Sequence, residues 1–226
     1  MFLTATPATT PIVTVLRPII LVLILFALAA QFVPHSALAS ANAGHICAAA
    51  VRQAETSHRV PRLLLHAVSL AESGRWHKDR QASIAWPWTV TARGTGKYYP
   101  DRSTAIAAVK RLKAEGVRNI DVGCMQINLM HHANAFETIE QAFDPLANTT
   151  YAAQFLKSLR SNAGSWAHAV ARYHSSNWKS RGQPYWRKVH RLWNKERWRD
   201  FRERRASRKQ NYRERQNQAA TQVTSQ

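Results

Sequence analysis

Glu72 is the acidic residue whose sequence surroundings best fit acid–base chemistry. It ends residues 60–72, a run in which apolar side chains recur at helical spacing, Pro61 suits the first helical position and Gly74 supplies a stop. At the end of an apolar helix, the helix dipole and the loss of water both oppose a negative charge, so the pKa of this carboxyl is expected to rise. A carboxyl that keeps its proton near neutral pH can act as a general acid. The alternative is that Glu72 is a solvated helix-end residue.

Two further stretches carry polar or aromatic groups that suit a binding cleft. Gln126 and Asn128 interrupt the apolar run at residues 122–128, where their amides must find hydrogen-bond partners or a polar ligand. Five aromatic residues lie within residues 75–99: Trp76, Trp86, Trp88, Tyr98 and Tyr99. They fit a hydrophobic core and equally a cleft in which aromatic faces stack on sugar rings.

The elements that would position these groups are mostly helices, with a small β wing. The wing is predicted as a hairpin around a glycine-containing turn at residues 93–97, with a short third strand at residues 117–121. Ser103 is predicted to cap one of the helices. The predicted helices span residues 46–57, 60–72, 103–115, 145–159 and 166–174, and Asp144-Pro145 is the start signal of the fourth. Trp186, Val189 and Trp193 at helical spacing predict a final helix, packed on the domain, to about residue 194.

The chain divides by composition into three parts. Residues 1–39 read as a signal peptide: Arg17 precedes the apolar residues 19–30, and Ala-Leu-Ala at residues 37–39 suits a signal peptidase. An uncleaved anchor is the alternative, although the run is shorter than the roughly 20 residues that span a bilayer. Residues 40–194 are predicted to form one exported domain. Residues 195–226 hold too few apolar side chains for a core, so a basic and disordered tail is expected.

The net charge of the chain indicates what kind of molecule it binds. The chain carries 32 Lys and Arg against 13 Asp and Glu, a net +19. Such a balance often indicates nucleic acid binding, but an exported protein meets anionic envelope polymers and membrane surfaces instead, so no nucleic acid partner is expected. Residues 179–226 hold 15 basic and 4 acidic side chains, 15 − 4 = +11 of the total. This segment is either an attachment arm or a solvated end.

The two cysteines, Cys47 and Cys124, both follow the predicted cleavage site. In an oxidising compartment such a pair predicts one disulfide, which would stabilise the fold by roughly 4 kcal/mol in the chain-entropy model. A zinc site needs more ligands than these, and the adjacent His131 and His132 lack a spaced partner motif. We therefore expect neither a metal nor a cofactor.

Three short motifs together resemble the signature of the soluble lytic transglycosylase (SLT) family. They are Ala-Glu-Ser-Gly at residues 71–74, Gly-Cys-Met-Gln-Ile-Asn at 123–128 and Ala-Arg-Tyr-His at 171–174, about fifty residues apart. The resemblance covers roughly residues 46–185. It implies a mainly α, lysozyme-like (α+β) fold with its β wing beside the cleft, and an enzyme that cleaves peptidoglycan.

The resemblance also implies roles for five residues. Glu72 matches the catalytic acid/base, and Ser73 matches a serine that hydrogen-bonds near the scissile sugar. Met125 and Gln126 match residues that line the cleft opposite the acid. Tyr173 matches the tyrosine that holds the catalytic carboxyl.

Two positions depart from the family pattern. Cys124 stands where leucine is usual, which fits a bridge to Cys47 that ties the cleft-lining loop to the first helix. His174 stands where asparagine is usual, so no role is carried over to it.

The mechanism that the resemblance implies uses one carboxyl. Glu72 would protonate the bond between N-acetylmuramic acid and N-acetylglucosamine, and the product would carry a 1,6-anhydro ring with no water consumed. Because glycoside hydrolysis ordinarily needs two carboxyls, a lysozyme-like muramidase using Glu72 and Asp121 is the alternative. A non-catalytic wall-binding module is a third. A periplasmic role in general wall remodelling and one beside a secretion or conjugation apparatus both stay open.

Overall fold

The computed structural model describes residues 35–224, with side chains described for residues 45–218. The chain falls into two units, Met1–Leu38 and Ala39–Gln226, and the elements below belong to the second, apart from the first turn of α2. The predicted apolar segment at residues 19–30 lies outside the described residues. Within the described range, no helix combines the length and the apolar character needed to cross a membrane.

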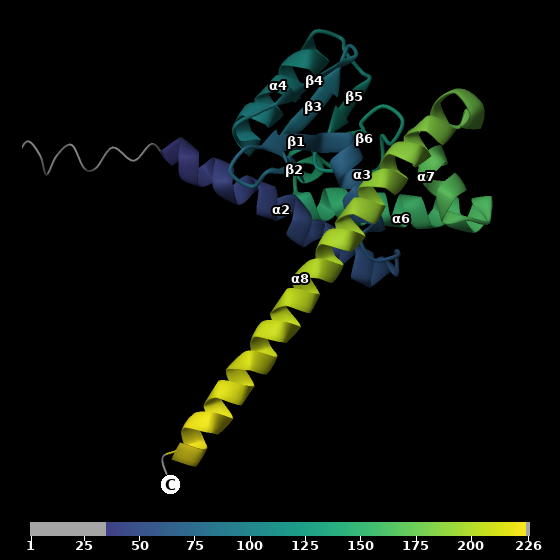
Figure 1. Ribbon diagram of the computed structural model, residues 1–226. Helices are drawn as coiled ribbons and strands as arrows, with labels where there is room; N and C mark the ends of the chain where they lie inside the picture. The colour runs from purple at the N-terminus through teal and green to yellow at the C-terminus, as the bar shows by residue number, and fades with distance from the viewer. Residues whose placement is uncertain (1–34, 225–226) are drawn as a thin grey trace, which may run out of the picture. The chain divides into compact units, whose positions relative to one another are not determined.

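Helices form most of the second unit (Figure 1). In chain order they are α2 (His35–His58), α3 (Leu64–Ser73), α4 (Arg102–Ala114), α5 (Ile139–Ala142), α6 (Pro145–Ala163), α7 (Trp166–His174), the π-helical turn η2 (Trp178–Gly182) and α8 (Gln183–Thr224). Helix α3 packs on α8, and α7 packs on both α6 and α8. Their shared core includes the fully buried Val51, Leu65, Val68, Leu156, Val170 and Val189.

A four-stranded antiparallel sheet forms the wing, in the order β4 (Thr95–Tyr98), β3 (Thr89–Ala92), β5 (Ile120–Val122) and β6 (Ile127–Asn128). Arg93 and Gly94 take φ of 53° and 74° between β3 and β4, as a type I′ hairpin turn requires. The sheet packs on α4 through a second core that includes Val90, Val109 and Phe143. The mainly helical class with a small β wing is confirmed. The wing has one strand more than predicted.

A separate hairpin joins the helical part to this sheet. It pairs β1 (Gly74–His77) with β2 (Ala82–Ala85), and Gly74 lies opposite Ala85. This hairpin was not predicted from the sequence. Its first residue, Gly74, directly follows Ser73, the last residue of α3, so the chain passes from helix to strand without a loop.

Helix α3 begins later than the periodicity predicts. The chain takes a left-handed φ of 64° at Leu63, after Pro61, and the helix starts at Leu64. The carboxylate of Glu55, on α2, accepts hydrogen bonds from the backbone N–H groups of Leu63 and His66, both at 3.0 Å. A buried side chain from another helix therefore caps α3, which spacing within residues 60–72 could not show.

Local capping is predictable where the cap lies next to its helix. Asp144 accepts from the Ala147 N–H at 2.7 Å and starts α6 as predicted. The predicted cap of α4 is wrong by two residues, because Asp101 accepts from the Thr104 N–H at 2.8 Å while Ser103 only donates to Asp101. A carboxylate before the helix outcompetes a hydroxyl within its first turn.

The predicted disulfide is present. Cys47 on α2 and Cys124 on the loop before β6 are bonded, with Cα atoms 5.8 Å apart across 77 residues of sequence. Both are fully buried in the helical core. The bridge therefore fastens the loop at residues 123–126 to α2.

Helix α8 differs from the predicted tail. It continues without a break from Gln183 to Thr224, where a disordered segment was expected from residue 195. Its distal part is rich in Arg, Lys, Glu and Gln, which are good helix formers, and Arg199–Glu203 and Asp200–Arg204 are i, i+4 ion pairs. Scarcity of apolar residues excludes a core but does not exclude a helix.

Candidate active site

A cleft of about 460 Å³ lies between the sheet and helices α3, α6 and α7. Its lining is more polar than apolar and carries carboxyls, amides, imidazoles and a phenol. The lining residues with ionisable or amide side chains include Glu72, Asp121, Gln126, Asn128, Tyr173 and His174. Such groups suit a ligand rich in hydroxyl and amide groups.

Glu72 reaches the cleft from the last turn of α3. The chain turns out of the helix immediately afterwards, and a Cβ on Gly74 would lie 2.2 Å from the Leu70 carbonyl oxygen. Only glycine fits there without a shift of the backbone. Gly74, two residues after Glu72, is thus required by the turn that follows the carboxyl-bearing end of α3.

The pKa of Glu72 is raised from 4.5 to about 7, as its place in the sequence predicts. Burial is the main cause, and the negative charge of Asp121 adds to it. A hydrogen bond from Tyr185 and the positive charge of Lys188 act in the opposite direction. The result is a carboxyl that holds its proton up to neutral pH, which is what a general acid requires.

The phenol that holds this carboxyl belongs to Tyr185. Its hydroxyl donates to Glu72 Oε1, whereas Tyr173, expected in that role, donates to the Met125 carbonyl at 2.9 Å. Burial raises the pKa of both phenols well above the ordinary value, so both act as donors. The ring of His174 stacks on that of Tyr185, with centroids 4.4 Å apart and planes at 6°.

Gln126 lies on the cleft wall with its amide fully engaged. Its Nε2 donates to the carbonyls of Thr89 and Gly123, at 3.2 and 3.1 Å, and its Oε1 accepts from the Thr91 hydroxyl at 2.5 Å. Its backbone takes a left-handed φ of 48°. These bonds join the cleft loop to β3. They are the hydrogen-bond partners that the sequence analysis required for this amide.

Ser73 and Met125 lie beneath the cleft rather than on its surface. Both are fully buried. The Ser73 hydroxyl donates to the Cys124 carbonyl at 2.7 Å, and the Met125 side chain belongs to the helical core. The two side chains were expected to contact substrate, but this placement keeps them away from the cleft surface. They support the backbone that carries Glu72 and Gln126.

Asn148 on α6 is a positioning residue that the sequence reading missed. It is fully buried, its Oδ1 accepts from the Met125 N–H at 2.9 Å, and its Nδ2 donates to the carbonyls of Val122 and Ala142, both at 3.1 Å. A Cβ on Gly123 would lie 2.5 Å from that nitrogen. An asparagine on the buried face of a helix was the available signal, because such an amide must be satisfied.

Asp121 is the second carboxyl of the cleft. It lies on β5, opposite Thr91 and Asn128 on the neighbouring strands, and accepts from Asn128 Nδ2 at 2.7 Å. Partial burial raises its pKa, while the bond from Asn128 lowers it. In the described part of the chain, no cluster of three or more His, Cys, Asp or Glu residues is arranged to hold a metal ion.

Comparison with known proteins gives one match. The family model described as the transglycosylase SLT domain matches residues 49–183, more than half of the 226 residues. No curated protein and no solved structure matches the chain. The matched range contains Glu72, the cleft loop and Tyr173, and it ends two residues before Tyr185.

Proposed function

The chain belongs to the transglycosylase SLT family of lysozyme-like, peptidoglycan-acting proteins, and we propose that it is a lytic transglycosylase with Glu72 as its single acid/base. The observation that carries this proposal is the Glu72 carboxyl, which has a pKa of about 7 and opens on a polar cleft. A group that titrates at the working pH can donate and then recover a proton in one cycle.

The proposed reaction cleaves the β-1,4 bond between N-acetylmuramic acid and N-acetylglucosamine. Protonated Glu72 gives its proton to the bridging oxygen as the bond to muramoyl C1 breaks, and the oxygen of the substrate's acetamido group closes on C1. The ionised carboxylate then removes the proton of the muramoyl 6-hydroxyl, whose oxygen displaces the acetamido oxygen. The product carries a 1,6-anhydro ring, no water is consumed, and Glu72 regains its proton.

Tyr185 and Lys188 have complementary parts in this cycle. The Tyr185 hydroxyl donates to Glu72 Oε1, which leaves Oε2 as the oxygen that carries the transferable proton. Lys188 is anchored through its Nζ to the Ala71 carbonyl at 2.6 Å, and its charge favours the ionised state of Glu72. Together they keep burial from raising the pKa beyond the range in which the carboxyl can cycle.

A muramidase that uses Asp121 as its second carboxyl is the competing function. It is favoured by the presence of Asp121 in the same cleft. The hydrogen bond from Asn128 and the strand pairing on both sides of Asp121 favour a structural role instead. An Asp121→Asn variant separates the two: the transglycosylase should retain most of its activity, whereas a two-carboxyl hydrolase should lose nearly all of it.

The setting is proposed to be the bacterial cell envelope. Two cysteines joined in a disulfide fit an oxidising compartment, and the predicted signal peptide would deliver the chain to the periplasm. General wall remodelling and local opening of the wall for a secretion or conjugation apparatus use the same reaction. Attachment through the basic segment would confine it to an anionic surface.

A further inference from the structure

The part of α8 outside the family match carries a surface that the cleft chemistry does not use. Residues 195–218 hold ten Lys and Arg and four Asp and Glu, 10 − 4 = +6. Every side chain from residue 201 to 218 is exposed. Three of the exposed side chains are aromatic: Trp198 is 68% accessible, Phe201 54% and Tyr212 64%.

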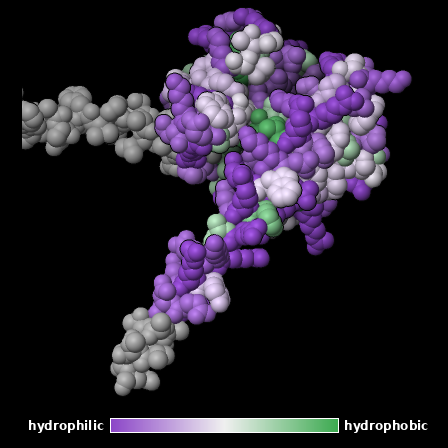
Figure 2. Space-filling model, in the orientation of Figure 1, coloured by the Kyte–Doolittle hydropathy of each residue, from purple (hydrophilic) through white to green (hydrophobic). Residues whose placement is uncertain are grey.

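These aromatic residues fall on one stripe of the helix. At 3.6 residues per turn, Trp198, Phe201 and Tyr212 lie within about 60° of one another around the axis. Cations lie on both sides of the stripe, namely Arg204, Arg208 and Arg215 on one side and Arg202, Lys209 and Arg213 on the other, and Arg205 falls within it. Along α8, Figure 2 shows neutral and apolar side chains among hydrophilic ones.

The acids occupy the opposite side. Glu196, Asp200, Glu203 and Glu214 also fall within about 60° of one another, roughly opposite the aromatic stripe. The helix surface is therefore divided into an acidic side and an aromatic, cationic side. A solvated helix held up only by i, i+4 pairs would not need this separation.

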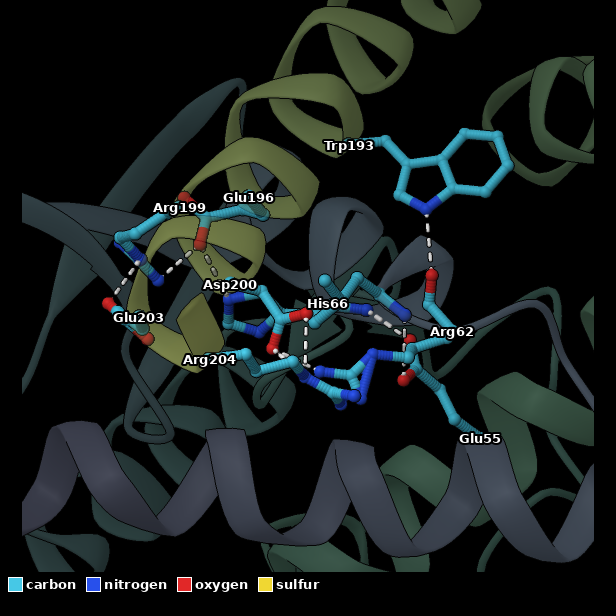
Figure 3. Close-up of polar contacts among 10 residues, drawn as sticks. Glu55, Arg62, His66, Trp193, Glu196, Arg199, Asp200, Glu203 and Arg204 are labelled. Atoms are coloured by element: carbon cyan, nitrogen blue, oxygen red, sulfur yellow. Dashed lines mark hydrogen bonds and ion pairs between the residues drawn. The ribbon is translucent and has the colours of Figure 1, made fainter. Parts of the chain in front are cut away.

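The catalytic domain takes up the proximal part of the acidic side (Figure 3). Arg62, just before α3, pairs with Asp200, and His66 Nε2 lies 3.6 Å from a carboxylate oxygen of the buried Glu196. The Trp193 indole N–H donates to the Arg62 carbonyl at 2.9 Å. Because these contacts fix the rotation of α8 about its axis, the aromatic side faces away from the α3 contact.

We propose that residues 195–218 form an interfacial helix that lies on an anionic lipid bilayer, with Trp198, Phe201 and Tyr212 at the headgroup–acyl boundary. Cations on both flanks would meet lipid phosphates while the aromatic rings sit below them, the arrangement typical of helices that lie in a membrane surface. A second copy of this chain fits poorly, because it would bring the two cationic flanks together. An anionic polymer or a nucleic acid would contact the cations alone, and the alignment of the three aromatic side chains would then be unexplained.

The test is sedimentation of the purified full chain with vesicles of phosphatidylglycerol and phosphatidylcholine, at physiological ionic strength. A triple variant, Trp198→Ser with Phe201→Ser and Tyr212→Ser, keeps every charge. Its matched control adds Ser207→Trp, Gln210→Phe and Asn211→Tyr, which restores the aromatic composition on the acidic side. Helix content and cleavage of soluble glycan fragments should be unchanged in both variants.

The native chain should bind anionic vesicles and bind pure phosphatidylcholine weakly. The partition coefficient of the triple variant on anionic vesicles should be lower by a factor of about ten or more. The control with displaced aromatic residues should not recover binding. Equal binding by all three chains would overturn the proposal and leave charge alone as the cause of attachment. If the triple variant lost binding to DNA or to anionic glycan polymer while its vesicle binding stayed unchanged, the proposal would be overturned in favour of those partners.

Discussion

The cleft and residues 195–218 of α8 place charged groups in opposite surroundings, the first with little water and the second in open solvent. In the cleft, loss of water raises the pKa of Glu72 to about 7, and nearby amides and hydroxyls are bonded to fixed partners. Along α8, nine of the ten cations in residues 195–218 are exposed to water. Charge is costly where water is excluded and nearly free where it is not, so each residue matters greatly in the first region and little in the second.

The sharpest way to break this contrast is to remove the proton that Glu72 is proposed to transfer. Glu72→Gln keeps the shape of the side chain but cannot cycle a proton, so turnover of peptidoglycan should fall by about 10²–10⁴-fold or more. The measurement is release of soluble fragments from purified sacculi, with Asp121→Asn as the matched control. A Glu72→Gln chain that keeps a tenth of the native rate would remove Glu72 from its role.

The covalent anchor of the cleft loop comes next in size. Replacing both Cys47 and Cys124 with serine should lower the free energy of unfolding by about 4 kcal/mol, because the denatured chain regains the freedom of a 77-residue loop. Chemical denaturation measures this. The same pair of substitutions should not change affinity for anionic vesicles while the chain is folded. A loss below 1 kcal/mol would mean that the loop is held by Asn148 and Ser73 without help from the bridge.

Burial of Glu72 should also cost stability in a defined pH range. Its pKa is about 7 in the folded chain against an ordinary 4.5, so its proton is retained on folding and the free energy of unfolding falls as pH rises from 4.5 through 7. The full effect is up to about 3 kcal/mol, less where water reaches the carboxyl. Glu72→Gln should therefore be more stable than the native chain at pH 8 and converge with it near pH 4.5. Parallel pH–stability curves would show that the carboxyl is solvated.

Loss of the Tyr185 hydroxyl should have a smaller effect with a distinctive signature. Tyr185→Phe removes a hydrogen bond that lowers the pKa of Glu72, so the alkaline limb of the pH–activity profile should move to higher pH. The rate should fall by about ten- to a hundredfold. Tyr173→Phe is the control, since its hydroxyl bonds a backbone carbonyl, and it should leave the alkaline limb in place. The opposite assignment of the two shifts would return the carboxyl-holding role to Tyr173.

The smallest catalytic effect is predicted at the distal end of α8. A chain ending after Arg204 keeps the ion pairs of Glu196 and Asp200 with the domain and loses Tyr212 and five of the ten cations of residues 195–218. It should cleave soluble fragments at the native rate and bind anionic surfaces less tightly at low salt, with the deficit fading as salt screens the charges. A folded but inactive truncated chain would place residues 205–226 in the catalytic domain.

What the sequence reveals depends on how far away the partner of each residue lies. Glu72 at the end of an apolar helix, the Asp144 cap and the Arg93–Gly94 turn are set by near neighbours, and each was predictable. Tyr185 was not, because 113 residues separate it from Glu72 and only the packing of α8 on α3 brings them together. The cap of α3 by Glu55 was missed although only 8 residues separate Glu55 from Leu63, because the capping side chain comes from a different helix.

Burial within a motif was equally hard to predict. Ser73 and Met125 stand in the motifs beside Glu72 and Gln126, which line the cleft. Residue type alone does not distinguish a side chain on the cleft wall from one beneath it. Helix α8 shows a different limit. Composition predicted correctly that residues 201–218 build no core, but helix propensity and i, i+4 pairs act locally and keep the segment helical without one.

Product analysis tests the central claim most directly. Purified chain is incubated with peptidoglycan in water enriched in heavy oxygen, and the released muropeptides are weighed by mass spectrometry. A single-carboxyl transglycosylase predicts 1,6-anhydromuramoyl ends, lighter than hydrolysis products by one water and free of the label. Reducing muramoyl ends that carry the label would show that water attacks the sugar, and would contradict the assignment of Glu72 as sole acid and base.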